Sequence, residues 1–250
     1  MTYNQIASLL HFLIFMVKEK KNLLVGEKRT HTLIISDLHL GSPVSQPKKA
    51  LKLLQSYSFR KLILLGDVFD NMDFRNMTKE CWELLNYIGK ISKDKKVRWV
   101  RGNHDGGLEN IFSSLMDARI HETYSWQYKH EKYLAIHGHQ FDRFMVNNAL
   151  LSYLATVFYT FVQKLDSEDK KFSRFLKRKS KGWLRLSEKV ARSALLYGKK
   201  QGARYVFCGH THRALEKRNH DILYYNSGCW TDLPCTYITI DENVIKIHEY

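Results

Sequence analysis

The sequence predicts an α/β fold built on a mixed rather than a purely parallel β-sheet. Short apolar runs typical of buried strands lie at residues 32–36, 62–65, 97–101, 133–136 and Tyr205–Cys208, and helical stretches such as residues 47–57 and Lys79–Ile91 alternate with them. The C-terminal part instead contains three consecutive strand-like runs, at residues 223–225, 237–240 and 244–248, and residues 241–243 form one of the tight turns that join them. Consecutive strands pair antiparallel, so we expect both strand directions in one sheet.

The chain divides into an N-terminal helical segment, residues 1–30, and a main domain, residues 31–250, with a helical insertion at about 143–201. The apolar run at residues 6–17 is too short to span a bilayer, for which about 20 residues are needed. It has neither a basic segment before it nor a small-residue cleavage site after it, which argues against a signal peptide. We expect a helix packed on the domain, with a membrane-surface helix anchored by Lys18, Lys20 and Lys21 as the alternative.

The four cysteines predict a reduced, cytoplasmic protein. Cys81, Cys208, Cys229 and Cys235 have no Cys-x-x-Cys spacing and form no disulfide framework.

The insertion is strongly basic and carries two apolar stripes. Between Lys164 and Arg204 the chain has 14 Lys or Arg against 4 Asp or Glu, within a total net charge of +15. The stripes repeat at helical spacing and consist of Leu150, Tyr153, Leu154, Val157, Phe158 and Phe161, and of Trp183, Leu186, Val190, Ala194 and Tyr197. Core packing explains such stripes, but with so much positive charge they also suit an anionic amphiphile, an anionic membrane surface or nucleic acid. Because the aromatic residues keep a helix-face spacing, an acyl-chain groove or a helix–helix contact is favoured over nucleic acid.

Five short motifs, each directly after a strand-like run, predict a metal-dependent hydrolytic site. They are Asp37-Leu38-His39, Gly66-Asp67, Gly102-Asn103-His104-Asp105, His137-Gly138-His139 and Gly209-His210-Thr211-His212. Carboxylate, imidazole and amide oxygen donors suit divalent Mn, Fe or Zn, and the absence of thiolates argues against a structural zinc site. Two such ions can clamp a phosphoryl group and activate a water molecule, so we interpret the series as a two-metal hydrolytic centre.

In this order the five motifs resemble the calcineurin-like metallophosphoesterases, from about Leu33 to the C-terminus. The resemblance implies a sandwich of two mixed β-sheets flanked by helices, with the metals at the C-terminal ends of the strands. It also implies that Asp67 bridges two metal ions, most commonly manganese, with iron or zinc as alternatives. One ion would take Asp37, His39 and His212, and the other Asn103, His137 and His210. Alongside Asp67, His104 would be the catalytic imidazole beside the substrate phosphate.

A second resemblance, to the UDP-2,3-diacylglucosamine pyrophosphatases of lipid A synthesis, concerns the substrate. It rests on residues 137–142 (HGHQFD), the helical insertion that follows, residues 208–212 (CGHTH) and residues 224–230 (YYNSGCW). It implies attack on the α-phosphorus to give UMP and a lipid phosphate, with the insertion as a lid over the lipid. Two positions depart from that branch, because Cys229 stands where many relatives have Asp and His104 where the best-studied type has Arg.

The predicted function is therefore a pyrophosphatase acting on a lipid-linked nucleotide, peripheral to the inner membrane. Lys179 and Lys181 would be substrate contacts on the lid, in the basic cluster Lys177, Arg178, Lys179 and Lys181 that would also face an anionic membrane. A phosphatase or phosphodiesterase acting on soluble phosphoesters or nucleic acid is the alternative. A non-catalytic scaffold would tolerate losses among the metal ligands, and the sequence has none.

Overall fold

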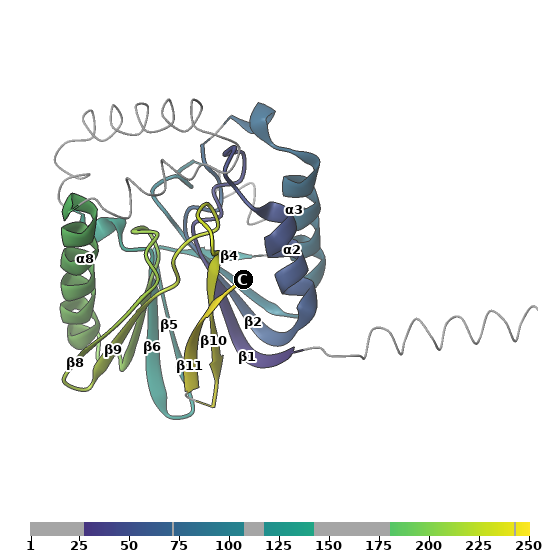
Figure 1. Cartoon of the computed structure of the whole chain (residues 1–250). Coiled ribbons are helices and arrows are strands. Elements are labelled where there is room, and N and C mark those ends of the chain that lie inside the picture. Colours follow the sequence, from purple (N-terminus) through teal and green to yellow (C-terminus); the bar gives the residue numbers. More distant parts are fainter. Residues whose placement is uncertain (1–27, 72, 108–117, 143–180, 243) are drawn as a thin grey trace, which may run out of the picture.

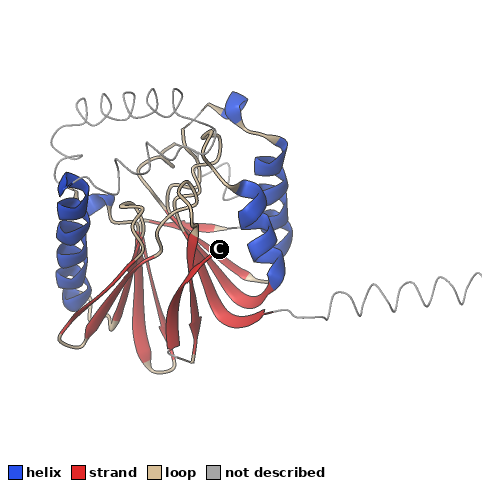
Figure 2. Cartoon of the chain, in the orientation of Figure 1, coloured by secondary structure: helices blue, strands red, loops and turns tan. Residues whose placement is uncertain are grey.

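Two β-sheets face each other in the computed structural model, and helices cover their outer faces (Figures 1 and 2). The structure describes residues 28–71, 73–107, 118–142, 181–242 and 244–250. Residues 1–27 of the predicted N-terminal helical segment, the stripe from Leu150 to Phe161 and the basic residues Lys177, Arg178 and Lys179 lie outside these residues. Residues 28–30, which the prediction placed in the same helical segment, instead begin a β-strand that pairs with its neighbours in the first sheet. None of the helices in the described ranges is both long and apolar enough to cross a membrane.

The first sheet has the strand order β11-β10-β1-β2-β3-β4. Strands β1 (Lys28–Ile35), β2 (Tyr57–Leu65), β3 (Lys96–Val100) and β4 (Arg119–His121) run parallel, whereas β10 (Thr236–Asp241) and β11 (Val244–Glu249) are antiparallel to their neighbours. Both directions occur in the second sheet too, whose order is β5-β6-β7-β9-β8. It contains β5 (Thr123–Tyr128), β6 (Glu131–Ile136), β7 (Tyr205–Cys208), β8 (Leu215–Asn219) and β9 (Ile222–Asn226). The predicted fold of two mixed sheets is confirmed.

Three apolar layers hold the sandwich together. Helices α2 (Pro47–Ser56) and α3 (Lys79–Ile91) pack on the outer face of the first sheet through residues such as Leu53 and Leu84. The layer between the sheets contains Ile34, Ile63 and Phe207. On the outer face of the second sheet, α8 (Lys181–Lys200) buries Ala191 and Ala194 against Val206 of β7. Single 3₁₀ turns, η1 (Phe74–Asn76) and η2 (His139–Phe141), lie in the connecting loops.

Most elements agree with the sequence prediction, and the differences concern element ends and short strands. The helix predicted for residues 47–57 ends one residue earlier, because Tyr57 already pairs with Lys28 as the first residue of β2. The short edge strands β4 and β8 and the strand β5 were not predicted. The described part of the predicted helical insertion is α8.

The second predicted stripe is mostly core rather than groove. Val190 and Ala194 are fully buried, and Tyr197 packs against the same apolar layer. Along these residues the prediction of an open acyl groove is wrong, because the helix face that carries them covers β7 and β9. Trp183, at the start of the helix, is only half-buried.

Gly198 tests this close packing of α8 on the second sheet. A side chain at Gly198 would overlap Val206 on β7, so Gly198→Val should push the helix outward and destabilise the protein by about 1–3 kcal/mol. Leu196→Ala on the same helix is the control, because Leu196 is 58% exposed and its loss should change stability by less than about 0.5 kcal/mol. Urea unfolding of the two variants measures the difference, and equal midpoints would contradict the packing.

Candidate metal centre

All seven predicted metal ligands lie just beyond the C-terminal ends of strands. Asp37 and His39 follow β1, Asp67 follows β2, Asn103 follows β3, His137 follows β6, and His210 and His212 follow β7. The loops lie together above the sandwich in the orientation of Figure 2. Backbone hydrogen bonds tie them to one another: the Asp37 N–H donates to Gly66 O, and the Gly209 N–H to His137 O, both at 3.0 Å.

Five of these residues have a left-handed backbone. Asp37, His39, Asp67, His210 and His212 have φ between 45° and 63°. Only a few per cent of non-glycine residues adopt positive φ, and such conformations concentrate at functional sites because the surrounding structure must hold them in place.

Glycines in the motifs make room for these side chains. A Cβ atom on Gly102 would overlap both the backbone nitrogen and the carboxylate of Asp67. One on Gly66 would overlap the ring of His137, and the φ of +82° at Gly66 independently favours glycine. The pairing of glycine with a donor residue in the Gly-Asp and Gly-Asn motifs is thus a steric requirement.

The first group of donors consists of Asp37, His39 and His212, whose ligand atoms lie within 4.8 Å of one another. His212 Nε2 lies 3.2 Å from Asp37 Oδ1 and 3.2 Å from His39 Nε2. This is the set predicted for the first ion.

The second group consists of Asp67, His137 and His210. Asp67 Oδ2 lies 3.2 Å from His137 Nε2 and 3.7 Å from His39 Nε2, so this carboxylate stands between the two groups. The other oxygen, Oδ1, accepts a hydrogen bond of 2.9 Å from the His104 N–H.

Buried atoms in this region are left for a ligand. Asn103 Oδ1 is buried and forms no hydrogen bond with the described residues, and the buried His137 Nε2 faces the Asp67 carboxylate at 3.2 Å. Unsatisfied buried polar atoms are uncommon and call for an explanation. A divalent cation supplies one, since amide oxygen, imidazole and carboxylate together are donors that such ions accept.

Neighbouring groups orient the imidazoles. His137 Nδ1 lies 2.9 Å from Leu65 O and donates to it, so Nε2 is the nitrogen that a metal ion would take after displacing its proton. His39 Nδ1 lies 3.3 Å from Asp70 Oδ1, and His210 Nε2 lies 3.4 Å from Asp142 Oδ2. Asp70 and Asp142 were not among the predicted site residues. Asp142 ends the HGHQFD motif, and its contact with His210 shows that the motif extends into the site.

Asp105 holds the loops that follow β2 and β3. Its buried carboxylate accepts hydrogen bonds from the backbone N–H groups of Val68, Phe69 and Gly102 and from the indole of Trp99. The sequence places Asp105 in the fourth position of its motif but does not reveal this role. Because Asp67 and Asn103 lie on the two loops, Asp105 fixes their separation.

Electrostatics favour ionised carboxylates at the centre. Burial raises the pKa of the Asp67 carboxyl, but the nearby imidazoles, His137 foremost, lower it well below its usual range. Burial lowers the pKa of His137, whereas Asp67 raises it further, to about 10. Without a cation, the pair therefore holds a proton on His137 that a metal ion must displace.

The two remaining histidines of the motifs differ. His104 Nδ1 lies 2.6 Å from Asp70 O, and the His104 ring meets the His39 ring edge-on at 4.9 Å. It also belongs to a donor group with His39 and Asp67. His139 lies outside the donor groups found in the described residues. Burial lowers its pKa to about 4, with further contributions from the nearby His137 and His210.

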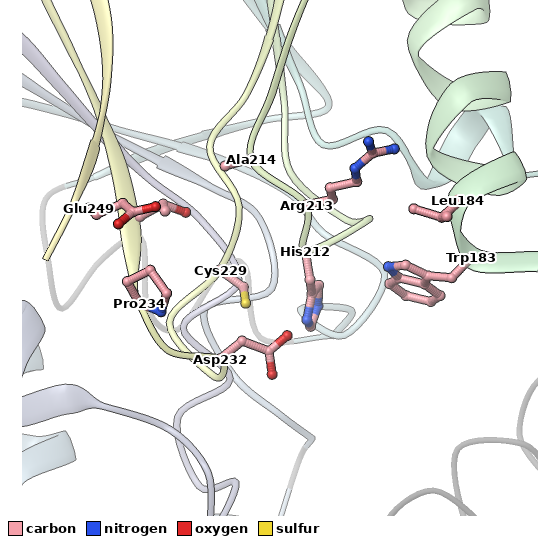
Figure 3. Close-up of a pocket in the computed structure, with 10 residues that line it drawn as sticks. Trp183, Leu184, His212, Arg213, Ala214, Cys229, Asp232, Pro234 and Glu249 are labelled. Atoms are coloured by element: carbon pink, nitrogen blue, oxygen red, sulfur yellow. The ribbon is translucent and has the colours of Figure 1, made fainter. Parts of the chain in front are cut away.

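A cavity of about 320 Å³ borders His212. Trp183 and Leu184 of α8 form one side of it, and Asp232 and Cys229 lie on the opposite side of His212 from Trp183 (Figure 3). Of the two predicted substrate contacts, Lys179 lies outside the described residues. Lys181 begins α8, and the structure does not describe its side chain.

Several solved structures and one family model are similar to this chain. A phosphodiesterase from an archaeon (15% identity, TM-score 0.49) covers 88% of this chain and 99% of its own length. Yfce, a phosphoesterase from E. coli (16% identity, TM-score 0.49), covers 86% and 90%. Vps29 from Entamoeba histolytica, complexed with zinc (13% identity, TM-score 0.44), covers 88% and 97%. No curated protein matches this chain. Residues 31–243 match the calcineurin-like phosphoesterase superfamily domain, and the chain therefore belongs to this superfamily of metal-dependent hydrolases.

Proposed function

We propose that the two donor groups form a binuclear metal centre that hydrolyses phosphoesters. The position of Asp67 carries this proposal: one buried carboxylate lies within 3.7 Å of imidazoles from both groups. A shared carboxylate is the natural way to hold two cations close together. We assign Asp37, His39 and His212 to one ion, Asn103, His137 and His210 to the other, and manganese as the metal.

Two bound ions would supply Lewis acidity for the phosphoryl oxygens and an activated water molecule. The protein contributes the positions of the groups around them. His104 Nδ1 donates to Asp70 O, since a carbonyl oxygen can only accept, and this leaves Nε2 as the nitrogen that exchanges a proton. We assign Nε2 of His104 to hydrogen bonding with the phosphoryl oxygen or to protonation of the leaving oxygen.

We further propose that the substrate is a UDP-linked diacylglucosamine-type lipid, cleaved to UMP and a lipid phosphate. Support comes from the HGHQFD and CGHTH motifs and from the cavity beside His212. The apolar side chains of Trp183 and Leu184 line that cavity, which leaves space next to the metal ligands for a part of the substrate other than its phosphates. Binding of the basic residues 177–181 to an anionic membrane stays a prediction.

Metal content tests the shared ligand. We expect two ions per chain after reconstitution with manganese, and Asp67→Ala should lose more metal than Asn103→Ala, because Asp67 belongs to both ions. Elemental analysis of the purified variants measures this. One ion or none in the wild-type protein would contradict a binuclear centre.

Metal uptake should release protons. Because the pKa of His137 is about 10 in the metal-free protein, its imidazole is protonated at pH 7 and must lose that proton to bind a cation. Metal affinity should therefore rise with pH, by up to about tenfold per unit for each proton displaced, until the pH reaches about 10. Calorimetry in buffers of different ionisation enthalpy counts the protons, and His137→Gln should release fewer.

His104 should affect turnover rather than metal binding. We expect His104→Ala to retain both ions yet to lower turnover of a chromogenic phosphodiester by roughly 10²–10⁴-fold, as for the loss of one acid–base group. Elemental analysis of the same preparation is the control. Loss of metal from this variant would instead show that His104 is a metal ligand. The geometry is compatible with that outcome, because His104 forms a donor group with His39 and Asp67.

Isotope-labelled water tests the substrate and the position of attack together. With UDP-2,3-diacylglucosamine in ¹⁸O-water, attack on the α-phosphorus places the label in UMP, which mass spectrometry detects, and Asp67→Ala is the inactive control. Label in the lipid phosphate would contradict the position of attack. If the protein cleaves polynucleotides or soluble phosphodiesters but not this lipid, the lipid assignment is wrong while the metal centre stands.

A further inference from the structure

A buried lysine lies away from the metal centre, on β2. Lys61 is 7% exposed, and its Nζ lies 4.8 Å from the centre of the Trp126 ring and 5.5 Å from that of Tyr124. Both rings belong to β5 of the second sheet. A buried ammonium group is costly unless it has a partner of opposite charge, and the proposed chemistry does not use Lys61.

Three more cationic side chains project from the same face of the first sheet. Lys61 pairs in register with Lys96 of β3, and Arg98 pairs with Arg119 of β4. Residues two apart on a strand share a face. Ile63 and Val100 belong to the layer between the sheets, so Lys61, Lys96 and Arg98 point toward the second sheet, and Arg119 follows Arg98.

This cluster of Lys61, Lys96, Arg98 and Arg119 has no counter-charge in the part of the chain that the structure describes: no carboxylate there forms an ion pair with any of the four. Burial, then Lys96 and Arg98, lower the pKa of Lys61 to about 8. Next to the cluster, His121 Nε2 is buried without a hydrogen-bond partner among the described residues. Its ring lies 5.0 Å from that of Tyr124.

We propose that Lys61, Lys96, Arg98 and Arg119 bind a phosphate-class oxyanion at a site separate from the metal centre. Adjacent strands are about 4.8 Å apart, and alternate residues on one strand about 7 Å apart, so the four positions frame an area that suits one or two phosphate groups. The anion would supply the missing counter-charge through charge-assisted hydrogen bonds. Lys61 precedes Asp67 by six residues, roughly 20 Å of extended chain, which separates the two sites.

The ligand is a small phosphate compound rather than a nucleic acid. Binding of single strands relies on aromatic rings that are open to stacking bases. Here Tyr124 and Trp126 stack on each other, at 5.2 Å and 15°, and Lys61 covers them. The cluster is also too small to follow a polynucleotide backbone.

Calorimetric titration of the manganese-loaded protein with inorganic phosphate tests this site. The wild-type protein should bind phosphate at the cluster in addition to the metal centre. Arg98→Gln should weaken the cluster site by about tenfold or more, the effect of losing one charged hydrogen-bond partner. Lys90→Gln is the matched control, because it removes one exposed positive charge from α3, which covers the opposite face of the same sheet. Asp67→Asn should lose phosphate binding at the metal centre and retain the cluster site.

Lys61→Met provides a second, independent readout. Methionine keeps an apolar stem beside Trp126 and removes the buried charge, so the variant should be at least as stable as the wild type in phosphate-free buffer. Phosphate should then raise the melting temperature of Asp67→Asn but not that of the double variant Asp67→Asn, Lys61→Met. Phosphate binding that is unchanged in Arg98→Gln and Lys61→Met would overturn the site. Binding of oligonucleotides that strengthens with their length and is lost in the same variants would overturn the assignment to a small anion.

Discussion

Neutralisation of buried negative charge is the constraint on which the architecture of the site depends. Asp37, Asp67 and Asp105 are almost completely buried near one another, where each ionised carboxylate requires partners. Asp105 obtains them from backbone and indole N–H groups, whereas Asp37 and Asp67 face imidazoles. The two sheets bring these partners together, because the carboxylates follow strands of the first sheet and His137, His210 and His212 follow strands of the second. The contacts between carboxylates of the first sheet and imidazoles of the second therefore join the two sheets, in addition to the apolar layer between them.

Asp105 connects this site to the rest of the fold. Trp99, which donates to it, packs against the apolar layer beneath α2 and α3 and contacts Phe69. Phe69 in turn follows Asp67 by two residues and donates its own N–H to Asp105. A change in the packing of α2 and α3 would therefore reach Asp67 through Trp99, Phe69 and Asp105. The same contacts support the left-handed backbone at Asp67.

The sequence predicts those features of the fold and site that depend on local pattern. The strands before the motifs and the order of the motifs themselves follow from apolar runs and donor residues. The structure places six of the seven predicted ligands in shared donor groups, and Asn103 is on the loop after β3 with its side-chain oxygen buried. Asp70 was missed because a carboxylate that orients a ligand has no sequence signal of its own, whereas Asp142 ends a motif that was used only to predict the substrate. The stripe through Val190 and Ala194 shows a second limit of prediction from sequence. Its spacing predicts an apolar helix face, but not whether a sheet covers that face. Lys61 could not be predicted at all, because only the pairing of β2 with β3 and the approach of β5 create its environment.

Cys229 lies on the loop beside His212 and has a buried thiol. The resemblance to the UDP-2,3-diacylglucosamine pyrophosphatases implies an aspartate at this position. Three residues further along the same loop, Asp232 brings a carboxylate to within 4.8 Å of the ligand atoms of His212 and Cys229. The neighbourhood of His212 thus contains a carboxylate, and Thr231 Oγ1 lies 3.3 Å from Nδ1 of the same ring. Relative to that implied aspartate, the difference therefore lies in the cavity wall more than in the electrostatics of the ligand. A soft thiol lines the cavity across His212 from Trp183, while a carboxylate and a hydroxyl lie beside the imidazole that joins the cavity to the metal centre.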